Sequence, residues 1–391
     1  MFKQNLTKLT YFVLLSAIWF GIGWSTRGIA NPQNAAPLPA EAQRILNAGQ
    51  LILNQYYSDH AIDPNELANA AIRGMVRYMD DRYAGLITDP VLDRFQADFA
   101  GETGGSGFAF DSIDGKFQIY KVRPHTPAER AGLQVGDVLL SVDGVRINEL
   151  SSGEEVALLL RGPIDQTVDI TVRRAGAELT LTVPRAAREP ITARMLDSQV
   201  GYLKLPAFTA GVADEMRTAL DELATQGMKS LIWDLRGNPG GSVRDAEAIL
   251  NLFINEGVLF TVEMKQGEPQ TFMADGHARW ANLPVTVLID GDSWSAAEIS
   301  TAALLDHHRA FVLGAKSGGK GIIQDTIPLD KDSMLHLTIA RWLSPNGHWI
   351  HKQGVQPEMA LVDNPATAAD EVIEAAISLS YTRSASLVMG E

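Results

Sequence analysis

Twice in its second half, the chain passes from a short apolar run through a turn into a helical pattern. The first run, Lys229–Leu235, is followed by Arg236-Gly-Asn-Pro-Gly-Gly241 and by a helical pattern that begins near Ser242. The second run, Pro284–Ile289, leads into apolar residues at helical spacing over Ser295–His307. Short apolar runs that are bounded by turns are typical of buried strands. The repeated order of strand, turn and helix predicts βαβ units in this part of the chain.

Ser295 falls at the second of these junctions, where a strand gives way to a helix. Free backbone N–H groups gather at a helix N-terminus, and they can stabilise a developing oxyanion. Glu298 lies in the first turn, where an acidic side chain is favoured. Ser295 is therefore a candidate nucleophile and Ser293 is its competitor, although a serine in this position is often only a helix cap.

The candidate base for such a serine is Lys320, because none of the eight histidines has an obvious pairing with it. Lys320 lies between glycines, which would let the backbone approach closely and hold the amine in a dry pocket. Desolvation lowers the pKa of a lysine, so that a neutral amine becomes available to accept the serine proton. Gln324 follows in a predicted strand, from which it could hold that amine. On its own, a Gly-Lys-Gly sequence is more often a solvated turn.

Two segments, Ser293-Trp-Ser-Ala-Ala-Glu-Ile299 and Gly319-Lys-Gly-Ile-Ile-Gln324, resemble motifs of the carboxyl-terminal processing peptidases. This family is also called the tail-specific proteases, or serine peptidase family S41. The resemblance implies that Ser295 is the nucleophile, that Lys320 is its base and that Gln324 supports the lysine. Departures from the family pattern that could alter the substrate pocket occur at Trp294, Ala297 and Gly318.

The turn after the first strand matches the family's Leu-Arg-x-Asn-Pro-Gly-Gly signature. By this resemblance, the N–H group of either Gly241 or Gly240 forms an oxyanion hole with that of Ala296. A pair of glycines after a strand exposes backbone N–H groups without side-chain obstruction. Without the resemblance, a tight turn with no ligand would be the simpler interpretation. Arg341–Ile350 and Gly354–Glu358 match later motifs of the family, with Glu358 in place of its usual aspartate.

From Gly104 to about Arg185 the pattern predicts short strands. Two segments there resemble a PDZ domain of the bacterial protease type, which we expect over residues 101–187. These segments are Thr126–Leu133 and Gly136–Gly144. The resemblance implies that Glu154–Leu160 forms one wall of a peptide groove, whose other side accepts the peptide as an added strand. Arg161 either senses the bound peptide or is a surface residue at a helix end. The peptide carboxylate would bind the backbone N–H groups of one loop, formed by Gly105, Ser106, Gly107 and Phe108.

The N-terminal residues differ from all that follow. Lys3 and Lys8 precede the apolar run Tyr11–Trp24, which has the composition and length of a signal peptide. Residues 1–30 are therefore a signal peptide or a membrane anchor, and 31–40 a linker. Both interpretations place the rest of the chain outside the cytoplasm.

The resemblance spans about residues 40–380 and implies a fold class. It is an α/β protease core of ClpP/crotonase-like βαβ repeats over 188–385, with an inserted PDZ domain and an N-terminal helical segment over 41–100. Asp63 and Pro64 mark a helix start in that segment. A closing helix is predicted over Ala366–Ser378.

The net charge of −14 and the absence of cysteine argue against several classes of function. An acidic chain is a poor partner for nucleic acid, and a chain without cysteine has no thiol nucleophile, disulfide or thiolate metal site. A serine and a lysine need no metal or cofactor. Together with the resemblance, this implies a serine endopeptidase that binds exposed apolar carboxyl-terminal tails of proteins or peptides and cleaves near that end.

Two alternatives stay open. One is a catalytically silent PDZ scaffold that binds peptides. The other is a chymotrypsin-like protease with a PDZ domain, which is disfavoured because Pro239 stands in place of the nucleophile in Gly237–Gly241.

Overall fold

The computed structural model describes residues 39–88, 91–99, 103–150, 152–187, 189–364, 367 and 369–389. The chain divides into two compact units, of which the first ends at Ile72 and the second begins at Arg73. The predicted signal peptide or anchor and most of the predicted linker lie outside the described residues. No helix in the described ranges has the length and apolar character needed to cross a bilayer.

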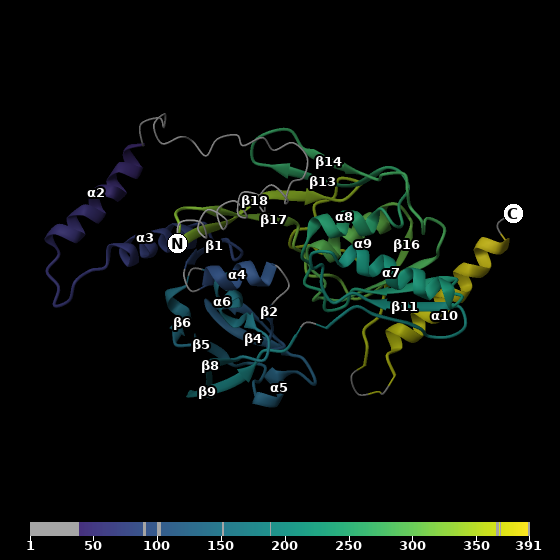
Figure 1. Cartoon of the computed structure of the whole chain (residues 1–391), viewed down its shortest axis with the longest axis horizontal. Coiled ribbons are helices and arrows are strands. Elements are labelled where there is room, and N and C mark those ends of the chain that lie inside the picture. The colour runs from purple at the N-terminus through teal and green to yellow at the C-terminus, as the bar shows by residue number, and fades with distance from the viewer. Residues whose placement is uncertain are drawn as a thin grey trace, which may run out of the picture. The chain divides into compact units, whose positions relative to one another are not determined.

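The first unit contains α2 (Ala40–Gln55) and the beginning of α3 (Pro64–Tyr78; Figure 1). Helix α3 starts where the sequence predicts, because the Asp63 carboxylate accepts the N–H of Asn65 at 2.7 Å. Pro64 occupies the first helical position, where its missing N–H costs nothing.

The second unit contains a six-stranded sheet whose central strands are parallel. In sheet order the strands are β10 (Thr192–Met195), β11 (Val200–Lys204), β12 (Ser230–Asp234), β15 (Val285–Ile289), β16 (Ala310–Gly314) and β19 (Met359–Ala360). The helices are α7 (Val212–Thr225), α8 (Val243–Leu250), α9 (Ala296–Asp306) and α10 (Glu371–Met389). The predicted βαβ units are present in this sheet, because α7 connects β11 to β12 and α9 connects β15 to β16.

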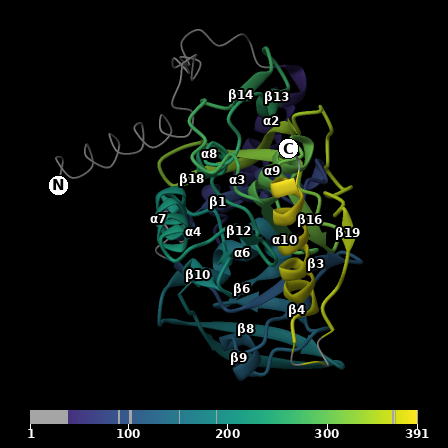
Figure 2. The same ribbon diagram turned by 90° about the vertical axis from the view of Figure 1, so that its right-hand side faces the viewer.

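Helices cover both faces of this sheet. Trp233 of β12 packs in a core cluster with residues of α7, α8 and α9. Ile232, the preceding residue, packs on the other face with Val372 and Ala376 of α10. Helix α10 is the yellow helix in Figure 2. Successive side chains of a strand point to opposite faces, so strands buried on both faces are continuously apolar. This explains why β12 and β15 read as unbroken apolar runs.

A second sheet contains a strand that the sequence analysis missed. The segment 41–100 was predicted to be helical, but it includes β1, which lies between α3 and α4 and pairs antiparallel with β18. The prediction was wrong here because β1 is held by a partner some 250 residues further along the chain, which no local pattern reveals. The elements are β1 (Gly85–Thr88), β13 (Val258–Met264), β14 (Gln270–Met273), β17 (Ile322–Pro328), β18 (Ser333–Leu343) and α4 (Val91–Phe99).

The segment that resembles a PDZ domain folds around a six-stranded antiparallel sheet. Helix α5 ends at Gly132, whose φ of +85° favours glycine. Helix α6 begins after Ser152, whose hydroxyl accepts the N–H of Glu155. The strands of the sheet are β3 (Phe108–Ile113), β4 (Lys116–Val122), β5 (Val138–Val142), β6 (Val145–Arg146), β8 (Thr167–Arg174) and β9 (Ala177–Pro184). The helices are α5 (Pro127–Ala131), α6 (Gly153–Leu160) and the short η2 (Ile147–Glu149), and β2 (Thr103–Gly104) pairs with β7 (Gly162–Pro163).

The closing helix α10 begins later than predicted and runs further. It spans Glu371–Met389 rather than Ala366–Ser378. Its start is set by Asp370, whose carboxylate accepts the N–H of Ile373 at 3.0 Å. The same carboxylate binds the guanidinium of Arg236, in the turn after β12, at 2.8 Å. A tertiary ion pair therefore fixes where this helix starts.

Candidate active site

The three loops that were predicted to carry chemistry follow three neighbouring parallel strands. Residues 236–241 follow β12, residues 290–295 follow β15 and residues 315–320 follow β16. The carboxyl ends of adjacent parallel strands lie at one edge of a sheet, which is where open α/β sheets bind their ligands. The topology therefore brings the predicted nucleophile, base and oxyanion loop together.

Ser295 occupies a strained turn between β15 and α9. Its φ of +54° and ψ of −114° are unusual for a residue with a side chain. Such strain is typical of functional sites, and a serine on a sharp strand-to-helix turn presents its hydroxyl outward in many hydrolases. The side chain is partly exposed.

Ser293, the competing nucleophile, is fully buried and its hydroxyl is occupied. It donates to the carbonyl oxygen of Leu235 at 2.8 Å and accepts the N–H of Asp290 at 3.0 Å. These bonds tie the turn after β15 to the end of β12. The geometry favours a structural role for Ser293 and leaves Ser295 as the better nucleophile.

Lys320 is held so that its amine loses much of its hydration. The amine lies over the ring of Tyr83, with Nζ 4.7 Å from the ring centroid. Burial lowers the pKa of Lys320 below its ordinary value, and the charge of Glu154 is the largest opposing influence. The flanking glycines are required by close packing, because a Cβ on Gly319 would lie 3.1 Å from the N of Gly354, and one on Gly321 2.7 Å from the N of His351.

Glu298 joins the nucleophile and base segments, a role that the sequence analysis missed. Its fully buried carboxylate accepts the N–H groups of Ser295 at 2.8 Å, Gly319 at 2.7 Å and Lys320 at 2.8 Å. It also accepts the hydroxyl of Ser317 at 2.5 Å. Burial raises the pKa of Glu298, and these four hydrogen bonds oppose the rise. The spacing Ser-x-x-Glu, which marks a capping box, was a signal for the first of these bonds but not for the other three.

Gln324 lies on β17, close in sequence to Lys320, but its observed partner is a different residue. Its amide Nε2 donates to the Thr338 hydroxyl at 3.4 Å, which is a long hydrogen bond. Within the described residues, no hydrogen bond joins Gln324 to the lysine amine. Support of Lys320 by Gln324 stays a prediction.

The glycine loop after β12 lies directly against the nucleophile. A Cβ on Gly240 would be 2.8 Å from Cβ of Ser295 and 2.9 Å from the N of Ala296. The N–H of Gly240 donates to Oδ1 of Asn238 at 2.8 Å, so it is already occupied. The bridge between Gly241 and Phe208 is formed by the carbonyl of Gly240 and the N–H of Ser242, which both bond to the backbone of Phe208. The N–H of Gly241 itself takes no part in this pairing. Of the two candidates, the geometry favours Gly241 as the oxyanion donor beside Ala296.

The predicted carboxylate-binding loop of the PDZ region is only partly available. The N–H of Gly105 donates to the carbonyl of Ala186 at 2.9 Å, so a peptide carboxylate would bind the N–H groups of Ser106, Gly107 and Phe108. Arg161 is the C-cap residue of α6, and its guanidinium lies 3.5 Å from the carboxylate of Asp98 on α4. This ion pair accounts for Arg161 without a peptide, and its sensing role stays a prediction.

Strand β4 of the PDZ region contacts the turn that carries the nucleophile. The Tyr120 hydroxyl donates to Oδ1 of Asp292 at 3.2 Å, and Lys121 forms an ion pair with the same carboxylate. Burial and the nearby Asp292 raise the pKa of Tyr120 to about 12. The sheet of the PDZ region is therefore linked to Asp292, a residue close to Ser295 in the chain.

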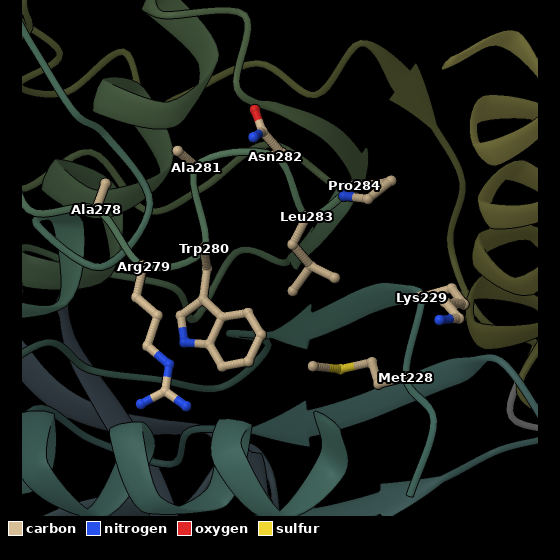
Figure 3. Close-up of a pocket in the computed structure, with 9 residues that line it drawn as sticks. All are labelled: Met228, Lys229, Ala278, Arg279, Trp280, Ala281, Asn282, Leu283 and Pro284. Carbon is tan, nitrogen blue, oxygen red and sulfur yellow. The ribbon is translucent and has the colours of Figure 1, made fainter. Parts of the chain in front are cut away.

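Other surface features lie away from these residues. A surface pocket formed by residues 228–229 and 278–284 contains none of the predicted site residues (Figure 3). In it, Arg279 stacks on Trp280, with 5.3 Å between the guanidinium carbon and the ring centroid. In the described part of the chain, no group of histidine, aspartate and glutamate side chains is arranged to hold a metal ion.

Comparison with known proteins points to one family. The profile of peptidase family S41 matches residues 199–361, and a PDZ domain profile matches residues 118–174. The chain is 31% identical over 362 residues to the carboxy-terminal processing protease CtpA of Bacillus subtilis, covering 90% of this chain and 76% of that protein. It is 32% identical over 349 residues to a carboxyl-terminal-processing protease of Synechocystis sp., covering 87% and 81%. The solved structure of a photosystem II D1 C-terminal processing protease superposes with a TM-score of 0.65 at 25% identity, covering 86% of this chain and 97% of that one.

Proposed function

This chain belongs to the carboxyl-terminal processing proteases of peptidase family S41, and we propose that it cleaves proteins near their carboxyl terminus with a Ser295/Lys320 dyad. One observation carries the proposal: the backbone N–H groups of Ser295 and Lys320 both donate to the carboxylate of Glu298. Two segments that are distant in sequence are thereby held side by side at the edge of the sheet.

In the proposed reaction, Oγ of Ser295 attacks the scissile carbonyl while the neutral amine of Lys320 accepts its proton. The N–H groups of Gly241 and Ala296 stabilise the negative oxygen of the tetrahedral intermediate. The lysine then donates the proton to the leaving amine, and water releases the acyl group by the same steps. Desolvation of Lys320 favours the neutral amine that the first step requires.

Replacement of the nucleophile tests the dyad. Ser295→Ala should lose on the order of 10⁴-fold in kcat/KM on an unfolded protein substrate, as other nucleophile deletions do. Its circular dichroism spectrum and melting temperature should match those of the wild type, because the Ser295 side chain is partly exposed. Full activity of Ser295→Ala would refute the assignment. An inactive wild type would instead favour the silent peptide-binding scaffold.

We propose that the PDZ region binds the free carboxylate of an exposed apolar tail through the loop Ser106–Phe108. An amidated peptide lacks that charge, and a lost charge-assisted hydrogen bond costs roughly 1.5–3 kcal/mol. The kcat/KM for a free-acid peptide should therefore exceed that for its amidated twin at least about tenfold. Equal rates on the two peptides would contradict tail recognition.

A glycine substitution can connect that difference to the loop. Gly107 has a φ of +92°, and a Cβ there would lie 2.3 Å from Cβ of Thr126. Gly107→Ala should therefore distort the loop and remove the difference between free-acid and amidated peptides. Gly115→Ala is the matched control, because Gly115 also has a positive φ but its Cβ would meet nothing within 4 Å. Retention of the difference in Gly107→Ala would exclude this loop as the carboxylate site.

Two further parts of the proposal concern where the protein is located in the cell and which fold its core resembles. We propose that residues 1–30 direct the chain out of the cytoplasm, as a cleaved signal peptide or as a membrane tether. N-terminal sequencing of the protein from fractionated cells would distinguish the two. The parallel βαβ core is the feature that supports a ClpP/crotonase-like relationship.

A further inference from the structure

Glu298 accepts hydrogen bonds from both halves of the proposed dyad through a single oxygen. Oε2 accepts the N–H of Ser295 at 2.8 Å and the N–H of Lys320 at 2.8 Å. These two nitrogens therefore lie at most about 5.6 Å apart, twice the length of one bond. Oε1 accepts the N–H of Gly319 and the hydroxyl of Ser317, so it anchors the segment that leads to the lysine.

We infer that Glu298 is a positioning residue that sets the spacing between Ser295 and Lys320 and places a negative charge beside the lysine. The inference rests on the proposed function, because it assigns a role within that dyad. A helix cap alone would need only the bond to Ser295, whereas three of the four donors come from the segment 317–320.

The cost of burying this carboxylate argues for a role beyond capping. Glu298 is fully buried, and no arginine, lysine or histidine of the described residues forms a salt bridge with it. A buried charge without a counter-ion is strongly unfavourable unless hydrogen bonds satisfy it. Here four donors do so, and every one belongs to the nucleophile turn or the base segment. The carboxylate and the two segments therefore depend on one another for their positions.

The charge of Glu298 also affects the protonation equilibrium of Lys320, whose neutral amine the dyad needs. A nearby negative charge stabilises the ammonium form of Lys320 and so raises its pKa, against the larger lowering by burial. Removing the charge should lower the pKa of Lys320 further. The acid limb of the activity profile, where the lysine loses its proton, should then move to lower pH. The other charged or titratable groups around this amine are Glu154, Asp81, Arg82, Tyr83 and His336.

The test compares two substitutions in the full chain. Glu298→Gln keeps the size of the side chain but removes the charge, and its NH₂ group would face N–H donors. We expect its kcat to fall about 100-fold with little change in KM, because small misplacements of catalytic groups have effects of that order. Its acid limb should move to lower pH. Glu298→Asp keeps the charge but shortens the reach, so its kcat should fall without that movement.

Asp137→Asn is the matched control, because Asp137 is also buried but lies in the PDZ region with Arg174 as its ion-pair partner. It should lower the melting temperature without moving the acid limb. If both Glu298 variants fail to fold, Ser317→Ala decides, because it removes one donor and leaves the charge in place. We expect its kcat to fall about tenfold at unchanged KM.

Two results would overturn the inference. One is a Glu298→Gln enzyme whose activity falls only in proportion to its unfolded fraction, with an unmoved acid limb. The other, if the Glu298 variants do not fold, is a Ser317→Ala enzyme with wild-type kcat. Neither result would refute the Ser295/Lys320 dyad, provided that cleavage by the wild type depends on Ser295. Cleavage that does not depend on Ser295 would refute the proposed function itself.

Discussion

Gly240→Ala should disable the protein far more than its small change in volume suggests. A Cβ at this position would lie 2.6 Å from the carbonyl oxygen of Trp294 and 2.8 Å from Cβ of Ser295. Ordinary contact begins near 3.4 Å, so the two loops must separate by about 0.6–0.8 Å. Both obstacles belong to the nucleophile turn and neither is the end of a flexible side chain. The nucleophile therefore moves relative to Gly241, the oxyanion donor on the glycine loop.

The size of the effect follows from that displacement. A misplacement approaching 1 Å can reduce catalysis about 100-fold, so we expect kcat/KM to fall by about that factor. Gly240 also has a φ of +92°, where a side chain costs roughly 1–2 kcal/mol. For a domain of this size, that cost alone should lower the melting temperature by roughly 2–8 °C. The clash should lower it further.

Gly237→Ala is the matched control for backbone strain. Gly237 lies in the same loop with a φ of +72°, but its Cβ would meet nothing within 4 Å. Its N–H bond to Oδ1 of Asp290, 2.8 Å long, is kept in the alanine variant. We expect the melting temperature of Gly237→Ala to fall similarly, while kcat/KM for an unfolded protein substrate stays within about threefold of the wild-type value once the folded fraction is considered.

The comparison can fail in two ways. A Gly240→Ala enzyme with more than about a third of wild-type activity would show that the loops do not need this close approach. An equal loss in Gly237→Ala would show that strain anywhere in the loop is sufficient. Either result would contradict the argument that contact between the glycine loop and Ser295 sets the geometry of the site.

Three further predictions concern Lys320 and the serines. Lys320→Met should be inactive, yet more stable than the wild type at neutral pH, because the unfolded chain protonates this amine more readily than the native protein does. Thermal melts should show that advantage vanishing as pH rises towards 10.5, the ordinary pKa, and an advantage independent of pH would contradict it. Tyr83→Leu removes the ring that faces the ammonium, so the acid limb of kcat/KM should move to lower pH, whereas Tyr83→Phe should leave it in place. Ser293→Ala leaves the buried groups that it binds without partners and should lower the free energy of unfolding by about 1–3 kcal/mol in urea titrations, while the folded enzyme remains active; a stable but dead variant would reassign the nucleophile.

Much of the core could be predicted from the sequence, because the signals there are local. Apolar runs such as Pro284–Ile289 have few alternatives to a strand that is buried on both faces, and β15 follows that run closely. Asp63 and Pro64 mark the start of α3, because capping depends only on neighbouring residues. The glycines that flank Lys320 were correctly expected to permit close approach of the backbone.

For the site, the motifs indicated the candidate residues but not their hydrogen-bond and ion-pair partners. The choice between Gly240 and Gly241 needed the side chain of Asn238, which occupies one of the two N–H groups. Gln324 was expected to support the lysine, yet its amide donates to Thr338 on the neighbouring strand. The partner of Arg161, Asp98, comes from a helix outside the predicted groove. Each of these outcomes depends on which hydrogen-bonding groups the fold makes available, and residue type alone does not specify that.

The sequence by itself determined which residues form strands, turns and helices in the core, and which residue types could serve as nucleophile and base. The tertiary structure decided that β1 is a strand, that Asp370 starts α10 through Arg236, and that one carboxylate joins Ser295 to Lys320. The physical reason is the range of the interactions. Capping and hydrophobic periodicity act over a few residues, whereas a strand partner or a buried carboxylate is satisfied by groups that only the folded chain brings within about 3 Å.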